Sequence, residues 1–289
     1  MKTKLLIGVI TSNCQTQTSA ELLQGIIKQA FLCDSDLAIL SPSTLLQHCT
    51  EKHHYSEKNI YNLIMSNRFD GFIYDTHFIS QNNEIKKYVE QLLKQSHKPV
   101  MMVDGKEHSI FENTSADDAS AFEQLVTHLI EVHKYKKIYC LTGPKESFFA
   151  VERLHGYFYA MDKHNLFYDE SYYYYGDFNT KSAIELGEKL ISHQLPLPDA
   201  IVCGNNLNAA TLIKKLSQGG IRVPQDVAVT GFDCTLHDID TNPFITSYMR
   251  ANFRLGAECF RRLYRILTGT ICKRIPNEQE GLHVGHSCG

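Results

Sequence analysis

Short apolar runs alternate with amphipathic segments along almost the whole chain, and this alternation restricts the fold to the α/β class. The runs at 5–10, 37–40 and 71–75 are apolar at nearly every position, as strands buried on both faces are. Between the first two, the segment 19–31 carries its leucines and isoleucines on a single helical stripe. Strands that alternate with helices in this way predict a parallel sheet covered by helices on both sides.

The alternation restarts near residue 118, which predicts two doubly wound sheets of similar size. No stretch rich in glycine, serine or proline separates the two halves, so we expect two lobes that lie close together with a ligand cleft between them. The predicted strands are 5–10, 37–40, 71–75, 99–104, 137–141, 172–176, 199–203 and 227–231, and the predicted helices are 19–31, 59–67, 84–95, 118–132, 150–164, 181–193, 206–220 and 253–269.

Composition and charge exclude several classes of protein. The chain has 289 residues, 43% of them hydrophobic, which is enough for sizeable cores. Its net charge of −3 gives no support for DNA binding by this chain alone, because DNA-binding domains usually present a basic face. No apolar run approaches the roughly 20 residues that a membrane-spanning helix needs. The apolar run near the N-terminus is shorter than a secretory signal core, and we interpret residues 4–10 as the first strand.

The nine cysteines show no CxxC spacing and no regular framework. Most of them lie in apolar runs, which indicates reduced thiols and a cytoplasmic location. His283, His286 and Cys288 stand close together in the sequence, but a metal site would need further ligands. We therefore expect no metal and no cofactor. Residues 172–175 are four tyrosines, which we interpret as a strand with alternating buried rings, the alternative being one ring at the edge of a ligand site.

Polar residues collect directly after the predicted strands. In open parallel sheets, ligands bind beyond the carboxyl ends of the strands, so these residues are candidates for ligand contacts. The alternative for each of them is to cap the helix that follows, which asparagine and aspartate commonly do. The strand-end residues are Thr11, Ser12, Asn13, Asp75, Asp104, Asn205, Asn206 and Asp233.

Several longer segments resemble one known family. The stretches "ERLHGYFYAM", "GDFNTKSAIELGEKLI", "PDAIVCGNN", "RVPQDVAVTGFD" and "PFITSYMRANFRLGAECFRRLYRILTG" follow the order seen in the effector-binding core of LacI/GalR transcriptional regulators. The resemblance covers roughly residues 4–269. It implies a periplasmic-binding-protein-like type I fold, with one lobe formed by 1–115 plus about 252–277 and the other by 116–249 plus about 278–289.

The resemblance also implies which residues contact the ligand. Arg153 stands where the family has an arginine that clamps the effector, although a helix-surface ion pair with Glu152 or Asp162 is the alternative. Two positions differ from the family pattern, with Asn206 and Cys234 standing where aspartate is usual. Together with the strand-end argument, this gives a predicted site of Ser12, Asn13, Asp75, Asp104, Arg153, Asn205, Asp233 and Phe253.

The function that the resemblance implies is that of a small-molecule sensor. We expect a sugar or sugar-like effector, a homodimer in the cytoplasm and no membrane contact. We also expect no enzymatic activity, because the sequence lacks GxSxG, GxxxxGK[ST], GxGxxG and HExxH motifs. Only "MKTK" precedes the first predicted strand, so DNA control is expected through a domain outside this chain. The alternatives are a solute-binding protein of a sugar transporter, and a sensor fused to an AraC-like or diguanylate cyclase output module.

Overall fold

The computed structural model divides the chain into two compact units. Unit 1 comprises 1–116 and 251–278, and unit 2 comprises 117–250 and 279–289. Each is an α/β structure built on a mostly parallel sheet, which confirms the predicted fold class. The lobe boundaries expected from the sequence differ from this division by one residue at each point, and the role of the units as lobes that close on a ligand stays a prediction. The structure describes residues 4–11, 14, 17–41, 58–76, 83–105, 111–234, 244–275 and 280–289.

Unit 1 contains a five-stranded sheet in the order β2-β1-β3-β4-β5. All of its strand pairs are parallel. Four of these strands were predicted, and the short β5 was not, because its sequence ENT carries no apolar residue. The strands are β1 (Leu6–Ile10), β2 (Asp36–Leu40), β3 (Gly71–Asp75), β4 (Val100–Val103) and β5 (Glu112–Thr114).

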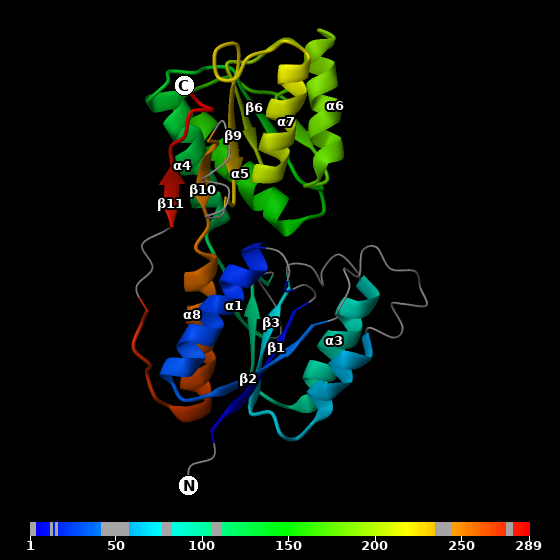
Figure 1. Ribbon diagram of the computed structural model, residues 1–289, viewed down its shortest axis with the longest axis vertical. Helices are drawn as coiled ribbons and strands as arrows, with labels where there is room; N and C mark the ends of the chain where they lie inside the picture. The colour runs from blue at the N-terminus through cyan, green and yellow to red at the C-terminus, as the bar shows by residue number, and fades with distance from the viewer. Residues whose placement is uncertain are drawn as a thin grey trace. The chain divides into compact units, whose positions relative to one another are not determined.

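Helices cover both faces of the unit 1 sheet (Figure 1). Helices α1 (Gln17–Leu32) and α8 (Asn252–Thr268) pack together on one face, and α3 (Asn83–Ser96) covers the other with the 3₁₀ helix η2 (Lys58–Met65). The sequence predicted an α-helix at η2. Its two buried residues, Tyr61 and Ile64, are three positions apart, the spacing that one turn of a 3₁₀ helix aligns.

Unit 2 contains a six-stranded sheet in the order β11-β10-β9-β8-β6-β7, in which β11 alone pairs antiparallel. The strand β10 was not predicted, because Thr246 and Ser247, which are buried on its two opposite faces, stand in place of an apolar run. The strands are β6 (Ile138–Thr142), β7 (Tyr173–Tyr175), β8 (Ala200–Cys203), β9 (Ala228–Phe232), β10 (Thr246–Met249) and β11 (Gly281–His283).

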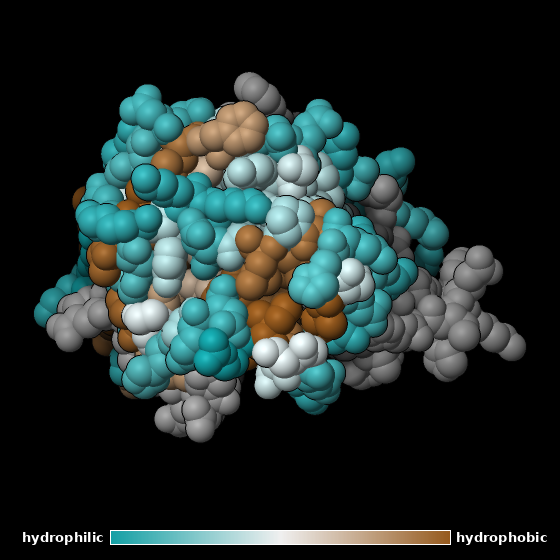
Figure 2. All heavy atoms as spheres, turned by 90° about the horizontal axis from the view of Figure 1, so that it is seen from above, coloured by the Kyte–Doolittle hydropathy of each residue, from teal (hydrophilic) through white to brown (hydrophobic). Residues whose placement is uncertain are grey.

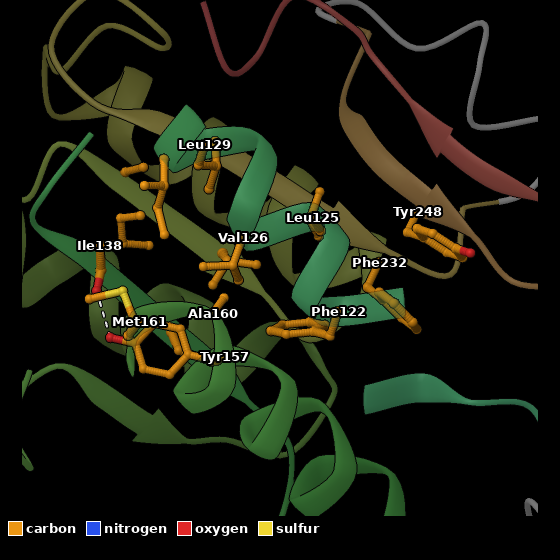
Figure 3. Packing of buried hydrophobic residues seen from close by; sticks show 14 of the residues in the cluster. Phe122, Leu125, Val126, Leu129, Ile138, Tyr157, Ala160, Met161, Phe232 and Tyr248 are labelled. Atoms are coloured by element: carbon orange, nitrogen blue, oxygen red, sulfur yellow. Dashed lines mark hydrogen bonds between the residues drawn. The ribbon is translucent and has the colours of Figure 1, made fainter. Parts of the chain in front are cut away.

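The two faces of the unit 2 sheet hold separate hydrophobic clusters. Helices α4 (Asp118–Glu131) and α5 (Phe148–Lys163) cover one face, and α6 (Thr180–Ile191) and α7 (Asn206–Gln218) cover the other. On the α4 face, Phe122 packs against Phe232 with ring centroids 5.4 Å apart, and the Tyr157 hydroxyl donates a 2.9 Å hydrogen bond to the Ile138 carbonyl (Figure 3). The core on this face therefore reaches to the last residue of β9.

The four consecutive tyrosines lie at an edge of the unit 2 sheet. Tyr173 packs on the α5 face, with its ring 5.2 Å from that of Phe158, and Tyr174 packs on the other face, 5.8 Å from Tyr139. The rings therefore alternate between the faces as predicted. The first three rings remain only half-buried and Tyr175 is exposed, because β7 is an edge strand.

A pair of glycines brings α1 and α8 into close contact. A Cβ atom on Gly25 would lie 2.0 Å from the Phe253 carbonyl oxygen, and a Cβ atom on Gly256 would lie 2.1 Å from the Leu22 carbonyl oxygen. Real Cβ atoms never approach backbone so closely. The two helix backbones therefore meet at positions where neither helix carries a side chain, and glycine is required at both positions.

One pair of cysteines forms a disulfide bond that the spacing of the cysteines did not predict. A disulfide joins Cys33, directly after α1, to Cys272, beyond α8, with Cα atoms 6.7 Å apart. The two residues are 239 positions apart in the sequence, so their spacing gives no hint of the pairing. It follows from the packing of α1 against α8. The remaining described cysteines are free, and all except Cys14 are buried.

The surface is mostly hydrophilic on the face drawn in Figure 2, where hydrophobic residues gather in a patch near the middle of the view. Within the part of the chain that the structure describes, no helix combines the length and the apolar character required to cross a lipid bilayer.

Candidate functional site at the carboxyl edges of the sheets

Three neighbouring strands of unit 2 end in polar side chains at one edge of the sheet. β8, β9 and β10 are adjacent and parallel, so their carboxyl ends lie side by side. Asn205 follows β8, Asp233 follows β9 and Arg250 follows β10. This is the edge at which ligands bind in open parallel sheets. Two of the three residues were predicted, and Arg250 was not.

Arg153 lies at this edge with its guanidinium group buried. Its side chain extends from α5 and is only 5% exposed. The Nε and Nη2 atoms donate hydrogen bonds of 3.0 and 2.9 Å to Oδ2 of Asp118, and Nη1 donates one of 2.7 Å to the Gly204 carbonyl oxygen. The alternative partners expected from the sequence were wrong: Glu152 lies beside His155, and Asp162 accepts a hydrogen bond from Tyr168.

Asp118 binds two guanidinium groups at once. Its Oδ2 accepts from Arg153, and its Oδ1 accepts a 2.6 Å hydrogen bond from Nε of Arg250. Burial alone would raise the pKa of Asp118, but the charges and hydrogen bonds of Arg250 and Arg153 outweigh burial, and its pKa is lowered. Asp118 therefore stays ionised and fixes the orientation of both arginines.

Aromatic rings surround the Arg153 guanidinium. Its Cζ atom lies 4.4 Å from the ring centroid of Phe232 and 5.4 Å from that of Phe178, within the range of cation–π attraction. Phe178 has a φ of 57°, which is rare for a bulky residue. Its ring lies where a Cβ atom on Gly143 would be, 2.1 Å from the nearest ring atom. The left-handed backbone at Phe178 and the missing side chain at Gly143 together place a flat apolar face at this edge.

Asn205 has the capping role that the sequence analysis weighed as its alternative. Its Oδ1 accepts a 2.7 Å hydrogen bond from the backbone N–H of Asn208, which caps α7. Its Nδ2 donates a 2.8 Å hydrogen bond to the Phe178 carbonyl oxygen. Asn205 therefore also holds Phe178 in its strained conformation. The next residue, Asn206, has a buried Oδ1 with no hydrogen-bond partner among the described residues.

Asp233 ends β9 in the left-handed region, with a φ of 59°. Its backbone N–H donates a 2.9 Å hydrogen bond to the Tyr248 carbonyl oxygen, and its side chain is partly exposed. Aspartate tolerates this conformation better than most residues, which turns the carboxylate out of the line of the strand. The strand "AVTGF" is thus followed directly by a partly exposed carboxylate.

In unit 1, two predicted carboxylates lie at the ends of adjacent strands. The Thr11 hydroxyl, after β1, donates a 2.9 Å hydrogen bond to Oδ2 of Asp75, the last residue of β3. Asp104 follows β4 with a φ of 50°, and its Oδ1 accepts a 3.1 Å hydrogen bond from the Ala116 N–H. Both carboxylates are buried. Phe253 is the second residue of α8 and is partly buried, while the predicted Ser12 and Asn13 lie outside the described residues.

A separate cavity of about 300 Å³ lies within unit 1. None of the predicted site residues lines it. It lies mainly between the residues at the end of β5 and the first turns of α8, and Ala116, one of its lining residues, donates its N–H to Oδ1 of Asp104. We place the candidate site at the strand ends, where charged groups and aromatic rings are oriented by hydrogen bonds. The cavity is lined by Thr114, Ser115, Ala116, Ala251, Arg254, Leu255, Glu258, Arg261 and Arg274.

Three residues of the unit 2 edge were missed by the sequence analysis. Asp118 reads as an ordinary acidic residue in the first turn of a helix. Arg250 directly follows a strand that was not recognised, and Phe178 lies in a loop between a strand and a helix. Only Arg250 carried a usable signal, because it is a lone charge at the end of the run "ITSYM".

Residues 126–288 match the family of periplasmic binding protein-like domains. The chain belongs to this family. Among curated proteins, it is 27% identical over 255 residues to the HTH-type transcriptional repressor PurR of Aliivibrio salmonicida (strain LFI1238), covering 86% of this chain and 71% of that protein. The resemblance to the effector-binding core of LacI/GalR regulators is thereby confirmed.

Solved structures of LacI-type regulators share the fold of this periplasmic binding protein-like chain. The transcriptional regulator CelR in complex with cellobiose matches with a TM-score of 0.76 and 22% identity, over 99% of this chain and 84% of that chain. The lac repressor dimer bound to operator and the anti-inducer ONPF matches with a TM-score of 0.74 and 19% identity, over 99% and 82% of the two chains. The homologues are transcriptional regulators of this family.

Proposed function

We propose that this chain senses a small polar effector, a sugar or a sugar-like molecule, on behalf of a transcriptional regulator. The observation that carries the proposal is the number of hydrogen bonds that the Arg153 side chain donates within the protein. An arginine side chain has five N–H donors, and the described residues accept hydrogen bonds from three of them. The two remaining donors belong to a guanidinium that Asp118 and Gly204 already hold rigidly, so an effector can bind to it without ordering the side chain.

The chemistry around Arg153 suits a hydroxyl-rich ligand with an apolar face. Arginine donates hydrogen bonds in a fixed fork, and a carboxylate such as Asp233 accepts from paired hydroxyl groups. The rings of Phe178 and Phe149 lie 5.4 and 5.9 Å from the Arg153 Cζ atom and offer flat surfaces for a sugar ring. In unit 1, we assign contacts with the effector to five residues: Ser12, Asn13, Asp75, Asp104 and Phe253.

The wider role is supported by the relatives. PurR is named as a transcriptional repressor, and the lac repressor structure is that of a dimer on its operator. We therefore propose a cytoplasmic homodimer that controls transcription, with DNA contacted through a helix-turn-helix domain not contained in these residues. Effector binding shifts the equilibrium only by its difference in affinity for two states of the dimer. A monomeric mass in solution would contradict this assembly.

The effector site is tested by a thermal-shift screen against sugars, sugar phosphates, nucleosides and amino acids. A ligand at 100 times its dissociation constant adds about 2.7 kcal/mol of stability, which corresponds to a rise in Tm of roughly 5 °C at this size. For the ligand found, Asp233→Ala is expected to weaken binding by more than about 2 kcal/mol, roughly 30-fold, because a hydrogen bond to a charged group is lost. Isothermal titration calorimetry measures the change.

The matched control is Asp226→Ala, since Asp226 lies just before the opposite end of the same strand β9 and pairs with Arg222 at the surface. Its affinity is expected to equal that of the wild type. Equal affinities of both variants would remove the assignment of Asp233. Arg153→Ala is a poorer test of binding, because it also leaves Asp118 with one buried partner fewer. If the chain were instead a solute-binding protein, the ligand would bind equally well, but adding the ligand would not change operator binding by the full-length protein.

A further inference from the structure

We propose that His128, His133 and Cys288 form a binding site in unit 2 for a divalent metal ion of the zinc class. His128 is in the last turn of α4, His133 follows that helix, and Cys288 is in the C-terminal segment after β11. One ligand atom from each residue lies within 4.8 Å of the other two. The histidine side chains are partly buried and Cys288 is fully buried.

Two of the three distances between these atoms match those around tetrahedral zinc. The Nε2 atoms of His128 and His133 are 3.3 Å apart, and Sγ of Cys288 is 3.7 Å from Nε2 of His128. Zinc bonds to nitrogen at 2.0–2.1 Å and to sulfur at 2.3 Å, so tetrahedral coordination places two nitrogen ligands about 3.3 Å apart and a nitrogen and a sulfur about 3.6 Å apart. For the third edge, the ligand atoms of Cys288 and His133 lie within 4.8 Å of each other, and coordination would place them about 3.6 Å apart.

The scaffold holds the three residues independently of any metal. The Tyr135 hydroxyl donates a 3.0 Å hydrogen bond to the Cys288 carbonyl oxygen, and the Tyr135 ring stacks on His133 with centroids 5.4 Å apart. Next to the cysteine, the Ser287 hydroxyl accepts a 2.9 Å hydrogen bond from the Thr246 N–H and donates one to the Val229 carbonyl oxygen. The C-terminal segment is thereby fixed beside the end of α4 (Figure 1).

The surroundings favour the protonation state that a metal requires at His128 and oppose it at Cys288. Burial and the neighbouring His133 lower the pKa of His128, which favours the neutral imidazole that acts as a ligand. Burial raises the pKa of Cys288, so binding must release the thiol proton to solvent. The Thr246 Oγ1 atom, 2.9 Å from Cys288 Sγ, can donate a hydrogen bond to the resulting thiolate.

The ligand set selects the class of metal. Two imidazoles and one thiolate suit zinc, cobalt, nickel or copper, whereas magnesium and calcium prefer oxygen ligands. Both imidazoles are partly exposed, so water can complete the tetrahedron. A bound ion would join α4 to residues 160 positions further along the chain. Cys288 stands near His283 and His286 in the sequence, whereas the structure brings it to His128 and His133.

The test is a titration of the metal-free chain with Co²⁺ in the presence of a non-thiol reductant. The expected result is one Co²⁺ per chain and a near-ultraviolet sulfur-to-cobalt charge-transfer band, which Zn²⁺ removes by competition. Cys288→Ser is expected to abolish the band. His133→Ala, at a partly exposed position, is expected to weaken Co²⁺ binding at least tenfold and keeps the test decisive if Cys288→Ser does not fold.

Two matched variants separate this site from adventitious binding. Cys14→Ser removes an exposed cysteine, and His155→Ala removes a histidine on the surface of α5. Both are expected to leave the stoichiometry and the band unchanged. The proposal is overturned if the wild type gives no sulfur-to-cobalt band, if the band survives in both Cys288→Ser and His133→Ala, or if Cys14→Ser removes it.

Discussion

Asp118→Asn is expected to lower the free energy of unfolding of unit 2 by about 3–5 kcal/mol, the cost of breaking a buried ion pair from one side. The carboxylate is buried between the guanidinium groups of Arg153 and Arg250, with nitrogen–oxygen distances of 2.9 and 2.6 Å. Asparagine has nearly the same shape but no charge, so it leaves two cations facing each other in a buried site. Urea denaturation followed by circular dichroism measures the change.

Asp226→Asn is the control for the charge alone, because Asp226 forms its ion pair with Arg222 at the surface and its loss is expected to have little effect. A change in Asp118→Asn as small as that of the control would show that the buried cluster does not stabilise unit 2.

The loss of stability in Asp118→Asn also depends on pH. Because the folded pKa of Asp118 is lowered, its contribution is present above the unfolded value near 3.8 and is lost as the pH falls through the folded pKa. The two proteins should therefore converge in acid.

Gly256→Ala is expected to destabilise unit 1 by about 2 kcal/mol or more, within the range measured for overpacking. The added Cβ atom would lie 2.1 Å from the Leu22 carbonyl oxygen, a backbone atom that cannot rotate away. Either α1 must move away from α8 or both helices must bend. Helix propensity alone would favour alanine by about 1 kcal/mol, so the steric term must exceed this gain. Differential scanning calorimetry measures the result, with an expected fall in Tm of about 4–8 °C.

Gly187→Ala in α6 is the matched control. Its Cβ atom would meet the aliphatic part of the Lys215 side chain at 2.7 Å, and that side chain can move. This variant is expected to be neutral or slightly stabilised. If Gly256→Ala were equally well tolerated, the contact between α1 and α8 would not be as close as described. The Asp118 and Gly256 variants also lie in different units, so each should shift a different transition if the units unfold separately.

The sequence predicted nearly all of the regular structure, because the chain alternates between buried parallel strands and one-sided helices. It failed where that signal is absent. β5 has no apolar residue, and β10 buries two polar residues, Thr246 and Ser247. The partners of Thr246, Ser287 and Cys288, come from a distant part of the chain. The segment η2 is only eight residues long, so the spacing of its apolar residues does not distinguish a 3₁₀ helix from an α-helix.

The candidate site was predictable only in part, because strand ends are visible in the sequence and contacts between elements are not. Asp233 and Asn205 follow recognisable strands. The partner of Arg153 is Asp118, 35 positions earlier, where the residue looks like an ordinary helix-start acid. The metal cluster was missed for the same reason, since His128 and Cys288 are brought together only by the packing of the C-terminal segment.

Each unit is assembled from two separate stretches of the chain, and this has a consequence for biosynthesis. When a ribosome has delivered the first 116 residues, unit 1 still lacks α8, which supplies one wall of its core. Unit 2 in turn waits for residues 279–289, including Ser287, which links β9 to β10. The nascent polypeptide therefore exposes incomplete apolar surfaces until residues 279–289 have been synthesised, and we expect its folding yield in cells to depend on chaperones that shield such surfaces.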